Sequence, residues 1–179
     1  MAPPDKSRLA GLKVLLMDVD GVLTDGKLYH MVDKAGELVE LKGVDTQDGL
    51  GLAWLAKEGI KTGVISGRSS AGLAARAEML KMSHVVQGTL EKGAAWERIL
   101  RAEGASDAQA AFVGDDLPDL PLIKRAGFGV AVANARPEVK KAARYVTKAR
   151  GGQGALREVA ELILKARGSW TRLTREYGA

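Results

Sequence analysis

Short runs of apolar residues alternate along the chain with longer segments in which apolar residues recur every three or four positions. Five runs have the length and composition of buried strands: residues 14–17, 62–66, 84–87, 110–113 and 127–133. Six segments have the spacing of amphipathic helices: residues 48–58, 69–82, 91–103, 119–126, 137–143 and 154–167. Strands and helices in alternation predict an α/β fold with a mostly parallel sheet covered by helices on both faces.

The segment between residues 27 and 41 departs from this alternation. Residues 27–31 and 37–41 have the pattern of two antiparallel strands, and residues 32–36 between them end in a glycine turn. A lone hairpin leaves its apolar side chains exposed, and exposed apolar strands require a covering surface. We therefore expect this hairpin to be covered by pairing between subunits.

Length and composition are those of one soluble globular domain. The chain has 179 residues, of which 46% are apolar and 27% charged. It has no cysteine, which excludes disulfides, thiolate metal sites and a cysteine nucleophile. The N-terminus lacks the apolar core of a signal peptide and no run could span a bilayer, so we expect a cytoplasmic protein. We predict a single domain over residues 1–179, with an oligomerisation hairpin at 27–42 and a C-terminal tail at 168–179.

The charge balance favours a small anionic partner over a nucleic acid. The net charge of +5 comes from 27 basic against 22 acidic residues, and the excess is spread along the chain. Aromatic residues make up only 4% of the chain, so a platform for base stacking is not expected. A mildly basic surface suits an anionic small molecule.

The first predicted strand runs directly into two carboxylates one residue apart, Asp18 and Asp20. The carboxyl edge of an open parallel sheet is where such folds bind their ligands. Two carboxylates about 4 Å apart repel by about 4 kcal/mol at an effective dielectric of about 20. The pair is tolerated if a cation lies between the acids or if one of them holds a proton, and both conditions suit phosphoryl chemistry.

Three further features follow predicted strands in the same way. Ser66 and the glycine after it lead into a helix start, which forms an anion cradle. Lys92 stands at the start of another helix, where it can neutralise a phosphate or the crowded acids. A fourth strand ends in three acids, Asp115, Asp116 and Asp119, whose oxygens suit Mg²⁺.

Each feature also has a purely structural explanation. Ser66 could only cap a helix, Lys92 could be a surface lysine, and Asp116 and Asp119 could favour the helix start around Pro118. Four such features in this order, each after a strand, favour a single site.

The order of these motifs resembles the haloacid dehalogenase superfamily of phosphotransferases over nearly the whole chain. More narrowly, it is similar to the small tetrameric branch that contains 3-deoxy-D-manno-octulosonate 8-phosphate phosphatase. The segments that carry this second resemblance are residues 18–26, 63–68, 87–92, 114–119, 145–147 and 151–158.

The resemblance implies a covalent mechanism. Asp18 would be the nucleophile that forms an aspartyl-phosphate, and Asp20 would protonate the leaving sugar oxygen and then deprotonate the hydrolytic water. Mg²⁺ would be held by the Asp18 carboxylate, the Asp20 backbone carbonyl and Asp115.

The resemblance also assigns the residues around the reacting groups. Ser66 and Lys92 would bind the transferring phosphoryl group, and Arg68 would contact the substrate. Asp119 and Asp116 would order the metal site.

The fold implied is a Rossmann-like three-layer α/β/α sandwich without a cap domain. In the family the hairpins build a central barrel in a homotetramer, and a glycine-rich segment, here residues 151–154, approaches a neighbouring active site.

Two positions depart from the family pattern. Gln47 stands where an arginine is common, and Ser69 stands where a basic residue is common. Both changes remove positive charge that could meet a sugar carboxylate, so they bear on the substrate and not on the phosphatase core.

The resulting hypothesis is a Mg²⁺-dependent phosphatase for a 2-keto-3-deoxy sugar acid phosphate, with 3-deoxy-D-manno-octulosonate 8-phosphate favoured. The alternatives are a nine-carbon nonulosonate 9-phosphate as substrate, a catalytically silent oligomerisation module, and a receiver-type phosphoacceptor domain.

Overall fold

Six parallel strands form the central sheet of the computed structural model, which describes residues 5–178. Their order across the sheet is β5-β4-β1-β6-β7-β8. The strands are β1 (Val14–Met17), β4 (Lys61–Ile65), β5 (His84–Val86), β6 (Ala110–Gly114), β7 (Phe128–Ala131) and β8 (Tyr145–Val146). Strand β1 pairs in parallel with β4 on one side and β6 on the other, and all four of its residues are buried. The first carboxylate motif therefore leaves the sheet at its centre.

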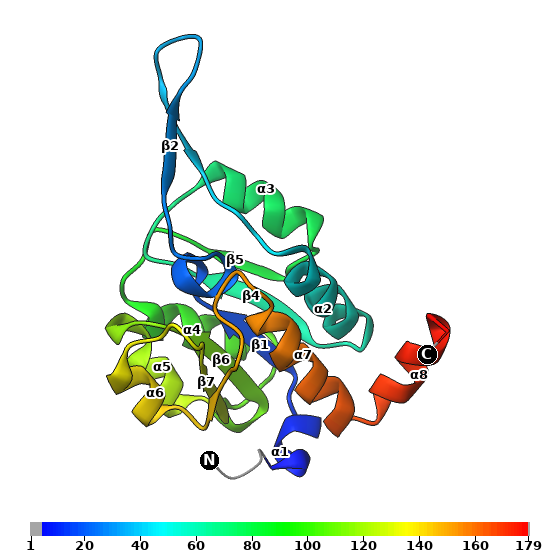
Figure 1. The fold of residues 1–179 in the computed structure, drawn as a ribbon. Coiled ribbons are helices and arrows are strands. Elements are labelled where there is room, and N and C mark those ends of the chain that lie inside the picture. The colour runs from blue at the N-terminus through cyan, green and yellow to red at the C-terminus, as the bar shows by residue number, and fades with distance from the viewer. Residues whose placement is uncertain (1–4, 179) are drawn as a thin grey trace.

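Helices cover both faces of this sheet, as Figure 1 shows. Helices α2, α3 and α7 lie on one face, where α2 packs along α7, and α4, α5 and α6 lie on the other. The helices are α1 (Lys6–Ala10), α2 (Thr46–Lys57), α3 (Ala71–Met79), α4 (Lys92–Ala102), α5 (Leu120–Arg125), α6 (Pro137–Ala142), α7 (Ala155–Ala166) and α8 (Ser169–Glu176). The predicted α/β fold with a parallel sheet covered on both faces is confirmed.

Helices α2 and α7 are joined by a buried carboxylate. Helix α7 begins after Gly154, which has no side chain with which to cap the helix. Asp48 of α2 replaces the missing cap, since its carboxylate accepts hydrogen bonds from the backbone N–H groups of Gly154 (3.3 Å) and Arg157 (2.7 Å). Burial raises the pKa of Asp48 to about 6. The start of α7 is thereby fixed against the helix that follows the hairpin.

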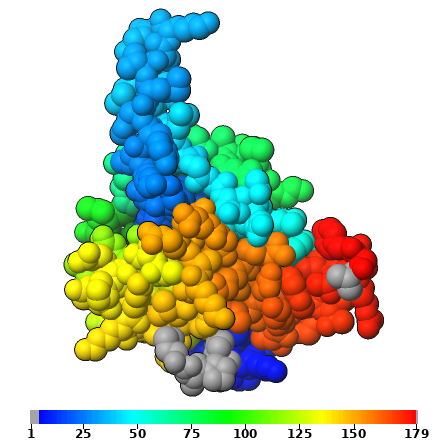
Figure 2. All heavy atoms as spheres, in the orientation of Figure 1, coloured from blue at the N-terminus to red at the C-terminus, as the bar shows by residue number. Residues whose placement is uncertain are grey.

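The predicted hairpin projects from the body of the domain (Figures 1 and 2). Strands β2 (Tyr29–Val32) and β3 (Leu38–Leu41) pair in antiparallel register. An isolated bridge between Thr24 and Val44 closes its base. Its large apolar side chains are exposed: Leu28, Tyr29, Met31, Val32, Leu38 and Leu41. The hairpin is observed as predicted, and within the single chain it leaves apolar surface exposed.

The predicted C-terminal tail, residues 168–179, is helical over most of its described part. Helix α8 packs on α2 of the same chain, where Trp170 meets Trp54 edge to face with ring centroids 6.0 Å apart. The Arg157 guanidinium lies 4.1 Å from the centroid of the Trp54 ring. Within residues 5–178, none of the helices combines the length and hydrophobicity needed to cross a bilayer.

Candidate active site

The loop after β1 presents Asp18 and Asp20 at the carboxyl edge of the sheet. It forms one wide turn, η1 (Val19–Leu23), in which Gly21 has a φ of +90°. A Cβ atom at Gly21 would come within 2.2 Å of the Asp115 carboxylate. Glycine is required here both for the left-handed backbone and for the close approach of Asp115.

Three carboxylates from two neighbouring strand ends converge at this edge. Oxygen atoms of Asp18, Asp115 and Asp119 all lie within 4.8 Å of one another. Burial and the nearby Asp119 charge raise the pKa of Asp18 to about 6. Burial and the charges of Asp119 and Asp18 raise the pKa of Asp115 to about 7. The cluster thus holds more negative charge than the protein neutralises.

One buried lysine, Lys92, neutralises part of this negative charge. Lys92, the first residue of α4, places its Nζ 2.9 Å from Asp18 Oδ1 and 2.7 Å from Asp119 Oδ1. Burial alone would lower the pKa of Lys92, but the charges of Asp119 and Asp18 outweigh it and raise that pKa above its ordinary value. Lys92 is therefore a fixed positive charge beside the first aspartate of the pair.

Asp119 and Asp116 occupy different positions although both follow β6. Asp119 is fully buried, and its Oδ2 accepts hydrogen bonds from the backbone N–H groups of Asp115 (2.8 Å) and Asp116 (3.3 Å). The exposed Asp116 carboxylate accepts a hydrogen bond from the backbone N–H of Leu117 (2.8 Å), which caps η3 (Leu117–Asp119). Asp119 therefore holds the loop after β6 from its buried side, and Asp116 lies on the exposed side of the same loop.

The Asp115 carboxylate fits a divalent cation. Its Oδ1 is buried and has no hydrogen-bond partner among the described residues. An unpaired buried carboxylate oxygen beside a second desolvated acid is the donor set that a hard cation such as Mg²⁺ prefers.

Most of the sequence-predicted site residues line one open cavity. Ser66, at the end of β4, is buried, and its Oγ accepts a hydrogen bond from the backbone N–H of Arg68 (3.2 Å). The cavity has a volume of about 270 Å³, and the predicted residues that line it are Asp18, Asp20, Ser66, Arg68, Lys92, Asp115 and Asp116. Asp119 is fully buried, hydrogen-bonded to Lys92 and to the Asp115 loop.

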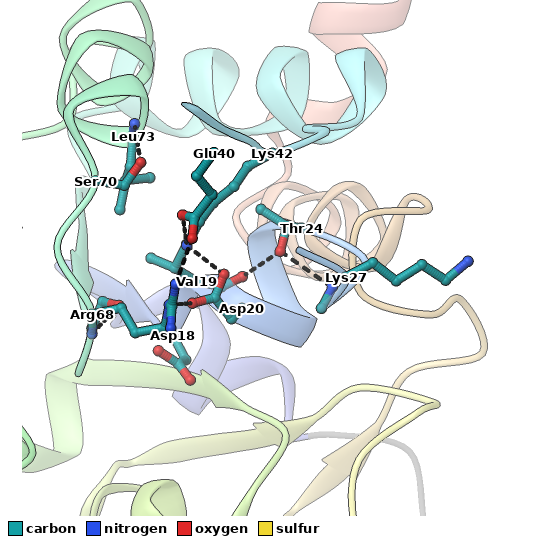
Figure 3. A network of polar contacts seen from close by, with 12 residues as sticks. Asp18, Val19, Asp20, Thr24, Lys27, Glu40, Lys42, Arg68, Ser70 and Leu73 are labelled. Atoms are coloured by element: carbon teal, nitrogen blue, oxygen red, sulfur yellow. Dashed lines mark hydrogen bonds and ion pairs between the residues drawn. The ribbon is translucent and has the colours of Figure 1, made fainter. Parts of the chain in front are cut away.

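Two charged residues of the hairpin also reach this site, as Figure 3 shows. Lys42 places its Nζ 2.6 Å from Asp20 Oδ1, and Glu40 pairs with Arg68. The sequence analysis missed both residues. Neither residue follows a strand of the main sheet. They lie close to Asp20 only because the second strand of the hairpin runs back toward the turn after β1.

Three hydrogen bonds that the sequence analysis missed support the turn that carries Asp20. Asn134 donates a hydrogen bond from Nδ2 to the Gly21 carbonyl (2.9 Å) and accepts one at Oδ1 from the Gly151 N–H (2.7 Å). The Gly152 N–H donates to the Val22 carbonyl (3.0 Å). Both glycines serve the active-site turn of their own chain. An approach of residues 151–154 to a neighbouring active site stays a prediction.

Comparison with known proteins agrees with this geometry. Residues 75–158 match the family model described as haloacid dehalogenase-like hydrolase. The chain is 40% identical over 159 residues to the 3-deoxy-D-manno-octulosonate 8-phosphate phosphatase KdsC of Yersinia pestis, covering 89% of this chain and 83% of the relative. The chain belongs to the haloacid dehalogenase superfamily.

Two solved phosphatase structures show the same fold. A probable yrbI family phosphatase from Pseudomonas syringae pv. phaseolica 1448a is 42% identical, with a TM-score of 0.91 and coverage of 97% of both chains. The 3-deoxy-D-manno-octulosonate 8-phosphate phosphatase from Moraxella catarrhalis is 38% identical, with a TM-score of 0.90 and coverage of 96% of this chain and 97% of that chain. The latter was solved in complex with a magnesium ion, a phosphate ion and a KDO molecule. The resemblance to this superfamily and its fold, inferred from the motifs, is confirmed.

Proposed function

We propose that the protein is a Mg²⁺-dependent phosphatase that hydrolyses 3-deoxy-D-manno-octulosonate 8-phosphate to the free sugar acid (KDO) and inorganic phosphate. The observation that supports this most directly is the cluster of Asp18, Asp115 and Asp119 around Lys92, which opens to a cavity containing Ser66. The Yersinia relative carries this name, and the Moraxella structure contains magnesium, phosphate and KDO.

The metal site that we propose consists of oxygen atoms from two strand ends. Asp18 and Asp115 would offer carboxylate oxygens and Asp20 its backbone carbonyl, since the buried Asp115 Oδ1 lacks any other partner in the described chain. When bound, Mg²⁺ supplies charge neutralisation and polarisation of the phosphoryl oxygens.

In the first step, an Asp18 carboxylate oxygen attacks phosphorus, and the bond between phosphorus and the sugar oxygen breaks. Asp20 gives its proton to that sugar oxygen, so the sugar leaves as an alcohol. The Lys92 ammonium, 2.9 Å from Asp18 Oδ1, favours the ionised nucleophile. Ser66 and Lys92 bind the equatorial oxygens of the phosphoryl group, where negative charge is concentrated.

In the second step, Asp20 takes a proton from a water molecule that attacks the phosphorus of the aspartyl-phosphate. The bond between phosphorus and Asp18 breaks, which releases inorganic phosphate, regenerates the Asp18 carboxylate and leaves Asp20 protonated for the next cycle. Arg68 lines the cavity with about half of its side chain exposed, and we assign it to the sugar acid.

The proposal extends to assembly. The hairpin exposes Val32 (63%) and Leu38 (69%), which face each other across β2 and β3. Exposed apolar strands are normally covered. We assign this surface to other copies of the chain in a homotetramer.

The function is tested by measuring phosphate release from a panel of acidic sugar phosphates, with and without Mg²⁺. We expect the eight-carbon 8-phosphate to be preferred over nine-carbon 9-phosphates, and hydroxylamine to trap an acyl-phosphate at Asp18. The Asp18→Asn variant should lose turnover. The matched variant Asp5→Asn should keep it, because Asp5 only caps α1 and asparagine caps equally well. Release of no phosphate from any member of the panel, or full activity in Asp18→Asn, would contradict the proposal.

A further inference from the structure

Lys42 is a buried cation held against the second aspartate of the active site. It follows the last residue of β3, and only 7% of its side chain is exposed. Its Nζ lies 2.6 Å from Asp20 Oδ1 and 3.5 Å from Glu40 Oε1 (Figure 3). Burying an ammonium group is costly unless it is paired, so this position is fixed by its two carboxylate partners.

Lys42 belongs to a closed ring of four charges. Asp20 Oδ2 lies 3.7 Å from Arg68 Nε, and Arg68 in turn pairs with Glu40. The two cations differ in freedom, because 51% of the Arg68 side chain is exposed against 7% for Lys42. Arg68 is able to turn toward a substrate, and Lys42 remains as the fixed contact of Asp20.

The carboxylate of Asp20 is oriented by one hydrogen bond, in addition to its longer ion pair with Arg68. Within residues 5–178, Lys42 is the only group that donates a hydrogen bond to it. The base of the hairpin is closed by the Thr24–Val44 bridge, which holds Lys42 close to the turn that carries Asp20. A carboxylate without such an anchor rotates freely, and a displacement of about 1 Å in a reacting group can cost about 100-fold in rate.

We propose that Lys42 is a positioning residue that holds Asp20 toward the leaving oxygen of the substrate. Because Lys42 occupies Oδ1, Oδ2 is the oxygen that carries the proton to the sugar oxygen. This inference rests on the proposed function, in which Asp20 is the proton donor. It adds a residue of the hairpin to the catalytic apparatus.

The test compares two esters that differ in their need for a proton. The alkoxide of a sugar phosphate is a poor leaving group and requires a general acid, whereas p-nitrophenolate leaves without one. In the Lys42→Met variant, kcat/KM for the sugar phosphate should fall by roughly 100-fold, and that for p-nitrophenyl phosphate should change little. Lys42→Arg should restore part of the sugar phosphate activity because it keeps a cation at this position.

Two further variants calibrate the result. Asp20→Asn should show the same selective loss. Lys27→Met should show none, because the Lys27 side chain points away from Asp20 (Figure 3) and is 72% exposed, and among the described residues it pairs only with Asp25, at 3.9 Å. If Lys42→Met does not fold, the same ratio is measured in Lys42→Gln.

Three results would overturn the proposal: equal losses with both esters, no loss with either, or a raised KM for the sugar acid with an unchanged kcat. The last result would make Lys42 a substrate ligand.

Failure of the proposed substrate is recognised separately, since the wild type would then hydrolyse p-nitrophenyl phosphate but not the octulosonate ester. The ratio is in that case measured with glycerol 3-phosphate. If Asp20→Asn lowers both esters equally, the acid role itself is wrong.

Discussion

At the scale of single residues, the site is defined by an imbalance of charge. Asp18, Asp115 and Asp119 meet one buried cation, Lys92, within one cluster. Desolvation makes each unneutralised carboxylate costly. This is why the pKa values of Asp18 and Asp115 rise to about 6 and about 7. A cation that binds here neutralises this charge and so removes the desolvation cost. It binds the form in which Asp18 and Asp115 are both ionised.

The first prediction concerns pH and magnesium. The folded-state pKa values of Asp18 and Asp115 lie above their unfolded values of about 4, so the metal-free protein should lose stability as pH rises from about 4 to about 7. Mg²⁺ binds the ionised form and should therefore raise the melting temperature more near pH 8 than near pH 5. Thermal unfolding in EDTA and in saturating Mg²⁺ at both pH values measures this difference. An equal shift at both pH values would contradict the assignment.

The second prediction separates two adjacent acids. Asp115→Asn should lower kcat/KM by at least about 100-fold, since even indirect partners of a metal are worth roughly 10–100-fold. Asp116→Asn should cost far less, because its carboxylate caps η3 and asparagine is an equally good cap. Steady-state kinetics across a magnesium titration give both values. A larger loss in Asp116→Asn than in Asp115→Asn would reverse the roles we assign.

The site residues at strand ends could be predicted from the sequence. The site residues that act through contacts between distant segments could not. Asp18, Ser66 and Asp115 follow apolar runs directly, so their place at one edge of the sheet could be predicted. Lys42 and Asn134 act through contacts between segments distant in sequence: Lys42 reaches Asp20, and Asn134 reaches Gly21. No local pattern marks such a contact.

At the scale of elements, the turn after β1 is held by the loop that precedes α7. The space between them is filled by backbone atoms. A Cβ atom at Gly151 would lie 1.8 Å from the Gly21 carbonyl oxygen. The two segments can meet only where side chains are absent.

The third prediction follows from this contact. Gly151→Ala should lower the free energy of unfolding by about 1–3 kcal/mol, as overpacked sites do, and should lower turnover by displacing the turn that carries Asp20. Gly93→Ala in α4 is the matched control. It meets open space, and helix propensity should leave stability unchanged or raise it by up to about 1 kcal/mol. Denaturant unfolding and steady-state kinetics on both variants measure these effects. Equal free energies of unfolding for Gly151→Ala and Gly93→Ala would contradict the importance of this contact.

Elements with strong periodicity were predicted, and short or tertiary ones were not. The predicted strand at residues 14–17 is observed with the same bounds. Strand β8 has only two residues, Tyr145 and Val146, too few to produce a period. Helix α8 was not predicted, because its inward-packing residues, Trp170 and Leu173, are too few to establish a helical period.

At the scale of the whole molecule, the domain and its hairpin differ in how their apolar residues are used. The sheet is enclosed by helices on both faces (Figure 1), but the hairpin extends beyond the body of the domain (Figure 2). Leu38 alone is 69% exposed. This exposed apolar surface is the one that we assign to contacts with other copies of the chain.

The fourth prediction is the size of the assembly in solution. Sedimentation velocity should show a tetramer for the wild type and smaller species for the double variant Val32→Glu, Leu38→Glu, because buried like charges opposite each other are strongly unfavourable. Lys34→Glu in the polar turn is the control and should leave the assembly intact. A monomeric wild type would rule out the assembly.

The antiparallel bridge between Thr24 and Val44 has a practical consequence. The hairpin leaves and re-enters the domain at this bridge. Its distal turn, at Asp33 and Gly36, therefore lies far from the active site (Figure 1). A fluorophore attached through an engineered thiol at position 34 would be the sole such label in a protein that otherwise lacks cysteine. Energy transfer between labelled copies would then follow association in real time while the enzyme turns over.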